Sequence, residues 1–206
     1  MSKSTGNVVD PVEVIDEWGL DAFRYYVVRE LAIGPDGNWT DEGFAARYGA
    51  ELANGLGNLL NRSLSMLNRY REGVVPVPHD ELAAEATAAR DKLVEQLRAN
   101  ELQAGLMTIW SFIARLNQYV DETAPFKIAK DPEQAERLGE VLYNLAESCR
   151  LLAVWLQPYL PDTSRRIMEQ LNLPAERINI AGADWGGLAA DHTIGEPKAL
   201  FPRRDT

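Results

Sequence analysis

The residues best suited to chemistry stand at the start of the chain, where Lys3 lies between Ser2 and Ser4 and is followed by Thr5 and Gly6. A lysine supplies a point charge, hydroxyl groups supply hydrogen-bond donors, and a glycine lets backbone amides approach a phosphate closely. These residues indicate a loop that holds nucleotide phosphates, although a short Lys–Ser string taken alone is more often a solvated terminus. Such a loop needs a nucleotide pocket, which we expect to lie outside these 206 residues.

The composition limits the class of protein. Hydrophobic residues make up 46% and charged residues 25% of the chain, which is typical of a globular protein. The sequence has neither an apolar run of membrane-spanning length nor a signal peptide, so we expect a cytoplasmic protein. Its single cysteine, Cys149, excludes an internal disulfide framework. His79 and His192 lie far apart without other ligands at metal-binding spacing, so no metal site is predicted.

The net charge is −10, from 31 acidic and 21 basic side chains. This balance argues against sequence-blind nucleic-acid binding, which depends on neutralising many phosphates. It leaves room for local contact, because a few arginines on one face can bind nucleic acid while the remaining surface is acidic.

The elements that must position these residues begin with a small α/β unit, which we expect over residues 1–40. Pro11 and Gly19 delimit a short helix, and Asp21 is a candidate N-cap for a second one. The β-branched and aromatic residues 25–28 fit either a helix or a strand, since periodicity alone does not separate the two.

From Thr40 onward the pattern becomes helical and predicts a mainly α fold, with a bundle of about five helices over residues 41–206. Thr40 is a candidate N-cap for one long amphipathic helix that ends near Arg71. Gly49, Gly55 and Gly57 weaken this helix by about 1 kcal/mol each relative to alanine, and we expect them to mark close helix–helix contacts. Further helices are predicted at about 80–98, 101–121, 132–157 and 162–171.

Four stretches resemble one family. The segment 1–11, Met-Ser-Lys-Ser-Thr-Gly-Asn-Val-Val-Asp-Pro, resembles the Lys-Met-Ser-Lys-Ser signature loop of class I aminoacyl-tRNA synthetases. The stretches 18–26, 56–62 and 121–130 narrow the resemblance to methionyl-tRNA synthetases. Because the resemblance covers almost the whole chain in the expected order, we favour this family over the valine and isoleucine enzymes, its nearest competitors.

The resemblance implies a role for the loop in the full enzyme. Lys3 would stabilise the negative charge that grows on the leaving pyrophosphate of ATP, with Mg²⁺ present and with Ser2, Ser4 and Thr5 in the same loop. The 206 residues do not include the family's nucleotide-binding domain, which would be a partner within the same polypeptide. We therefore expect this chain alone to bind no cofactor and to be inactive in catalysis.

The resemblance also implies that residues 1–40 contain the signature loop and a stem-contact fold, and that residues 41–206 read the CAU anticodon of methionine tRNA. Asn58 and Arg62 carry over as anticodon-binding residues. They lie four residues apart on one helix, so they share a face and offer an amide and a guanidinium to the same base. Phe126 stands where the family has a tryptophan, and its ring keeps a face for base stacking.

Other interpretations stay open from the sequence alone. Asn58 fits a polar helix contact, Arg62 fits a surface ion pair, and Phe126 fits a hydrophobic plug at a helix break. The whole chain fits a free-standing tRNA-binding module or a protein-interaction module. Trp110 and Trp155, at helical spacing among leucines, are expected in the core.

Overall fold

The computed structural model describes residues 9–30, 39–179 and 183–202. In these ranges the regular structure is helical, with one isolated antiparallel bridge between Val74 and Thr193. The helices are α1 (Pro11–Trp18), α2 (Leu20–Glu30), α3 (Asp41–Arg47), α4 (Asn58–Arg71), α5 (Ala83–Arg98), α6 (Leu102–Thr123), α7 (Pro125–Ile128), α8 (Ala135–Leu156) and α9 (Pro161–Gln170). A π-helical segment, η1 (Tyr48–Gly57), and the short 3-10 turns η2 (Pro132–Gln134) and η3 (Ala175–Arg177) complete them.

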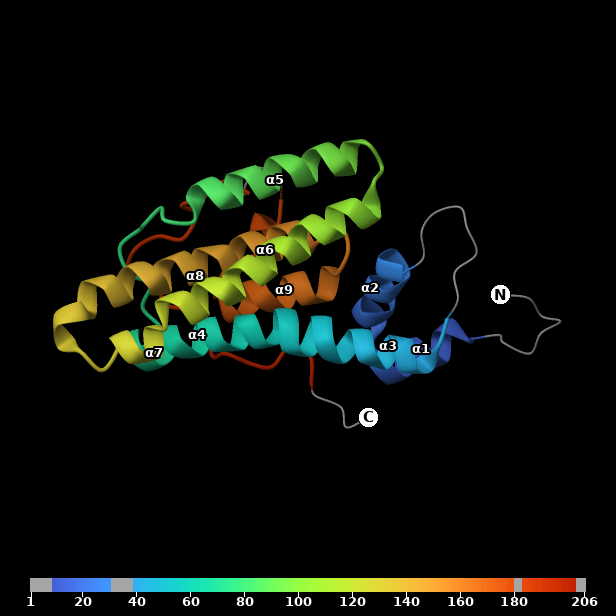
Figure 1. Cartoon of the computed structure of the whole chain (residues 1–206), viewed down its shortest axis with the longest axis horizontal. Coiled ribbons are helices and arrows are strands. Elements are labelled where there is room, and N and C mark those ends of the chain that lie inside the picture. The colour runs from blue at the N-terminus through green and yellow to red at the C-terminus, as the bar shows by residue number, and fades with distance from the viewer. Residues whose placement is uncertain (1–8, 31–38, 180–182, 203–206) are drawn as a thin grey trace.

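The molecule is an elongated bundle. Figure 1 shows α4, α5, α6, α8 and α9 running along its long axis, with α1, α2 and α3 gathered at one end and α7 at the other. The predicted mainly helical fold is confirmed, and each of the four later helices lies within three residues of its expected bounds.

The N-terminal unit is helical where it is described. Asp10 caps α1 by accepting a hydrogen bond from the Val12 amide at 2.8 Å, and Gly19 ends the helix with a φ of 91°. Residues 25–28 lie in α2, so the helix alternative is correct and no strand occurs in the described part of residues 1–40. A strand would point Tyr25 and Tyr26 to opposite faces, whereas the helix turns both rings into the core, where each is at most 4% exposed.

Asp21 lies in α2, but its side chain caps α9. Its carboxylate is buried in α2 and accepts a hydrogen bond from the Thr163 amide, in the first turn of α9, at 2.6 Å. The first amides of a helix have no partner within it, so a carboxylate from elsewhere in the fold can satisfy one. The prediction that Asp21 is the N-cap of α2 is therefore wrong, because this helix already includes Leu20 and the Asp21 carboxylate accepts from the first turn of α9.

The long helix predicted from Thr40 to Arg71 is continuous through α3, η1 and α4, and the Thr40 side chain accepts from the Gly43 amide at 3.1 Å. The expectation that its glycines mark helix–helix contacts is wrong. A Cβ at Gly49 would meet nothing within 4 Å, and one at Gly57 would meet the Leu52 carbonyl oxygen at 3.0 Å. That carbonyl lies five residues earlier, so the crowding comes from the π-helical turn itself.

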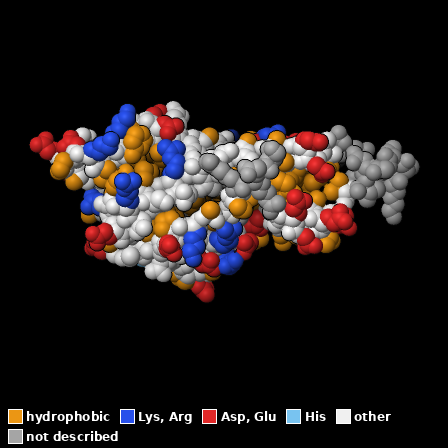
Figure 2. All heavy atoms as spheres, turned by 90° about the horizontal axis from the view of Figure 1, so that it is seen from below, with side chains coloured by type: hydrophobic (Ala, Val, Ile, Leu, Met, Phe, Trp, Pro, Cys, Tyr) orange, Lys and Arg blue, Asp and Glu red, His pale blue; other side chains and the backbone are white. Residues whose placement is uncertain are grey.

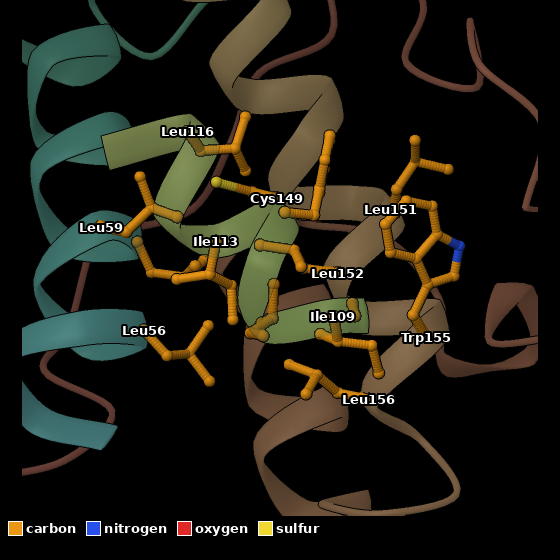
Figure 3. Close-up of a cluster of buried hydrophobic side chains, with 14 of the residues drawn as sticks. Leu56, Leu59, Ile109, Ile113, Leu116, Cys149, Leu151, Leu152, Trp155 and Leu156 are labelled. Carbon is orange, nitrogen blue, oxygen red and sulfur yellow. The ribbon is translucent and has the colours of Figure 1, made fainter. Parts of the chain in front are cut away.

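The core forms where α4, α6 and α8 meet. Figure 3 shows Leu59 of α4, Ile113 and Leu116 of α6, and Leu152 of α8 converging around Cys149. Cys149 is 1% exposed, and burial raises the pKa of its thiol to about 12. The prediction of buried positions for Cys149 and for the two core tryptophans, Trp110 and Trp155, is confirmed.

A buried ion pair ties the C-terminal segment to α8. The Glu147 carboxylate is fully buried and accepts hydrogen bonds from the Gly186, Gly187 and Leu188 amides at 2.8–2.9 Å. Arg150 donates to the same carboxylate at 2.6 and 3.0 Å and also to the Asp184 carbonyl. We call Glu147, Arg150 and residues 184–188 the clasp. The sequence pattern did not reveal it, because a Glu and an Arg three residues apart on a helix usually form a surface pair.

Candidate nucleic-acid interface

Arg62 lies on the surface where α4 meets the end of α6. Its Nη2 atom is 3.3 Å from Oδ1 of Asp121, and the two side chains are 34% and 71% exposed. The surface ion pair anticipated as one interpretation of Arg62 is therefore present. Such an exposed pair contributes only about 0–1 kcal/mol, so a ligand that offers better acceptors can replace the aspartate.

The break between α6 and α7 presents an aromatic ring. Ala124 adopts left-handed geometry with a φ of 43°, and Pro125 begins α7 at the next residue. Proline disfavours helical geometry in the residue before it, which is why α6 stops here. Pro125 is buried, whereas Phe126 is 44% exposed and is among the few large hydrophobic side chains at the surface. The residue that fills the break is therefore Pro125 rather than Phe126.

The fold places Arg62 beside the end of α6 that leads to Phe126. Asp121, the partner of Arg62, is five residues before Phe126, so one arginine and one exposed ring flank the end of α6. Asn58 is the first residue of α4, directly after the π-helical segment, and is partly buried. It lies one turn before Arg62, which confirms only that both residues share a helix face.

Exposed basic side chains lie at this end of the bundle among acidic ones. Figure 2, seen from below the view of Figure 1, shows hydrophobic side chains flanked by Lys and Arg at the end where α7 lies. Lys127 and Lys130 follow Phe126 and are exposed, and Arg69 is exposed on α4. Arg71 has a structural contact instead, because its guanidinium donates to the Ala135 carbonyl at 3.0 Å and joins α4 to α8.

A shallow pocket lies beyond Arg71, between the 74–79 connector and α8. It has a volume of about 470 Å³, and its lining combines valines and Pro76 with Arg71, His79, Glu136 and Asp191.

No group of three His, Cys, Asp or Glu side chains able to hold a metal ion occurs among the described residues. Along the same part of the chain, no helix has the length and apolar character needed to cross a bilayer.

The predicted phosphate loop, with Ser2, Lys3, Ser4 and Thr5, lies outside the described residues. Sequence reasoning missed the Asp121 partner of Arg62 and the clasp. No sequence feature of Asp121 indicates that it pairs with Arg62. The two consecutive glycines, Gly186 and Gly187, are consistent with backbone amides that approach a buried group.

Comparisons with known proteins identify the family models and relatives that this chain matches. Residues 1–64 match the family model "tRNA synthetases class I (M)", and residues 74–204 match "Anticodon binding domain of methionyl tRNA ligase". The methionine–tRNA ligase of Bacillus subtilis is 43% identical over 98% of this chain and 32% of its own length. That of Clostridium tetani is 41% identical over the whole chain and 33% of its own length.

Among solved structures, Mycobacterium tuberculosis methionyl-tRNA synthetase in complex with methionyl-adenylate aligns with a TM-score of 0.88 at 33% identity, over 98% of this chain and 41% of that one. The chain thus spans about a third of the length of the curated relatives it matches. These matches confirm the resemblance to the methionine enzymes drawn from the sequence motifs. With its helical bundle and its match over residues 74–204, the chain belongs to the methionyl-tRNA ligase family, in the part that contains the anticodon-binding domain.

Proposed function

We propose that this chain is the tRNA-reading part of a methionine–tRNA ligase and that it binds the CAU anticodon of methionine tRNA through Asn58, Arg62 and Phe126. The observation that carries the proposal is the exposed Phe126 ring at the α6–α7 break, close in sequence to the aspartate that holds the Arg62 guanidinium. An unstacked RNA base can stack on the ring. The guanidinium and the Asn58 amide can then bind the edge of a neighbouring base.

The structure supports this assignment through the weakness of the Arg62 contact. A guanidinium held by a buried carboxylate would be costly to redirect, whereas Asp121 is 71% exposed and can be hydrated when Arg62 turns to a base. Lys127 and Lys130, which follow Phe126 in the chain and are exposed, provide positive charge for the RNA backbone on a chain of net charge −10.

We further propose that the complete ligase acts in the cytoplasm and attaches methionine to tRNA with ATP and Mg²⁺, and that Lys3 assists the catalytic domain there. This part rests on the family membership and on the loop motif, since the loop lies outside the described residues. By themselves, the 206 residues should bind tRNA without activating methionine. A measurable ATP–pyrophosphate exchange rate from this chain alone would contradict that proposal.

Binding of a CAU stem-loop RNA, followed by fluorescence anisotropy, tests the anticodon assignment. Asn58→Ala and Arg62→Ala should each weaken binding by about 1–3 kcal/mol, the usual contribution of a specific base contact. Arg165→Ala is a matched control, because Arg165 is an exposed arginine on α9 with partners Asp162 and Glu169. If Asn58→Ala and Arg62→Ala bind as tightly as the parent, the assignment is wrong.

Phe126 is tested by two substitutions at the same position. Phe126→Ala should weaken binding by about 1–3 kcal/mol, because stacking of one base on an aromatic side chain is lost. Phe126→Trp should strengthen it, because the indole offers a larger ring surface and an N–H donor. Equal affinity of all three proteins would remove Phe126 from the interface.

A further inference from the structure

We infer that Arg69 is a phosphate-binding residue that extends the proposed anticodon interface along α4 and contacts the RNA backbone rather than a base. This inference rests on the proposed function. It concerns a different side chain and a different kind of contact, and no base recognition is assigned to Arg69.

The first observation is the geometry of α4. At about 100° per residue, Arg69 lies about 20° around the helix axis from Asn58 and on the same side as Arg62. The buried residues Leu60, Ser63 and Leu67 fall on the opposite side of the helix. Arg69 therefore shares the solvent face of the two proposed base readers, about 10 Å beyond Arg62 along the axis.

The second observation is that the three arginines of α4, Arg62, Arg69 and Arg71, have different partners. Arg62 pairs with Asp121, and Arg71, which points toward the buried side, donates to the Ala135 carbonyl. Arg69 is exposed, and its guanidinium lies 5.7 Å from the centre of the Tyr70 ring. Among the described residues it has no carboxylate within ion-pair distance.

The lack of an acidic partner matters in this chain, which has 31 acidic side chains. Most other arginines in the described part have either a carboxylate partner, as Arg115 and Arg137 do, or a backbone carbonyl, as Arg24 and Arg166 do. An exposed guanidinium beside a proposed RNA site can neutralise a phosphate without first leaving an aspartate or glutamate. The contact with Tyr70 limits the freedom of the side chain and leaves its N–H groups open to an anion.

A simpler interpretation is that Arg69 only stabilises the C-terminal end of α4 through the helix dipole. The two interpretations differ in measurable ways. A dipole contact affects the stability of the helix, whereas a phosphate contact affects RNA affinity equally for every anticodon and makes that affinity depend on salt.

The experiment measures binding of the 206-residue chain to a CAU stem-loop and to the same stem-loop with an altered anticodon, over a series of salt concentrations. Arg69→Ala should weaken both complexes by the same factor, about three- to tenfold at low salt. The slope of log K against log salt should become shallower by about 0.7, the value for one phosphate contact on single-stranded RNA. Arg69→Lys should keep the slope, because a lysine also neutralises a phosphate.

Arg98→Ala is the matched control. Arg98 is an exposed arginine in the last turn of α5, again without a carboxylate partner among the described residues, and it should leave affinity and slope unchanged. Circular dichroism of each variant verifies the helical fold. An unchanged slope in Arg69→Ala, or a loss confined to the CAU anticodon, overturns the inference.

The Arg62→Ala variant separates this inference from the proposed function. If Arg62→Ala weakens CAU binding and Arg69→Ala has no effect, only the role of Arg69 is wrong. If neither substitution has an effect, or if the chain binds no RNA, the proposed interface is wrong and the inference is wrong with it.

Discussion

Two arginine–carboxylate pairs in this molecule have the same chemistry and opposite consequences. Arg62 and Asp121 meet at the surface of α4 and α6, with side chains 34% and 71% exposed. Arg150 and Glu147 lie in α8 with side chains 3% and 0% exposed, and the glutamate also accepts three backbone amides. Water screens the first pair and is excluded from the second, so the first can exchange partners while the second holds a chain segment in place.

The largest effect is expected for Glu147→Ala. The substitution removes the carboxylate that neutralises the buried Arg150 guanidinium and accepts from the Gly186, Gly187 and Leu188 amides, so the free energy of unfolding should fall by about 3–5 kcal/mol. Urea denaturation monitored by circular dichroism measures this difference. A loss below 1 kcal/mol would mean that the clasp behaves like the surface pair, and the contrast between the two regions would disappear.

Gly187→Ala tests how rigidly the clasp is packed. A Cβ at this position would collide with the guanidinium of Arg150, which cannot swing away because Glu147 holds it. The expected loss is about 1–3 kcal/mol, as for other overpacked sites. Gly49→Ala is the control, because its Cβ would meet nothing within 4 Å. This control should stabilise the helix by up to about 1 kcal/mol, and equal losses in both variants would contradict the packing argument.

The pKa of the Cys149 thiol, next to Arg150, measures how far water is excluded from this part of α8. Burial raises the pKa of its thiol from 9.0 to about 12. The unfolded chain therefore releases the thiol proton above pH 9 while the native state keeps it, and stability falls as the pH rises from about 9 toward 12. One such group contributes a slope of at most about 1.4 kcal/mol per pH unit.

Cys149→Ala should remove this contribution, so its free energy of unfolding should fall less steeply than that of the parent between pH 9 and 10, while the buried tyrosines contribute equally to both proteins. Parallel pH profiles of the two proteins would show that the thiol is hydrated in the native state.

The smallest effect on stability is expected for Arg62→Ala, which should change the free energy of unfolding by less than about 1 kcal/mol. The same variant is expected to lose RNA affinity, so stability and binding separate at this residue. A stability loss as large as that of Glu147→Ala would show that Arg62 holds the bundle together, and it would weaken the case for Arg62 as an RNA ligand.

Much of the fold follows from local patterns in the sequence. Thr40, Pro11 and Gly19 mark helix ends through contacts within a few residues, and the structure confirms all three. The expectations that failed involve distant partners. Asp21 caps α9 rather than α2, and the glycines of the long helix lie in a π-helical segment instead of at helix crossings.

For the candidate site, the sequence by itself determined the family motifs and the shared face of Asn58 and Arg62, because the 3.6-residue period of a helix is a local property. Only the tertiary structure decided that Asp121 pairs with Arg62, that Phe126 is exposed while Pro125 is buried, and that Arg150 is inside while Arg62 is outside. The reason is physical. Whether a charge is hydrated or buried depends on segments that pack against it from 40 to 60 residues away, and no local spacing encodes that packing.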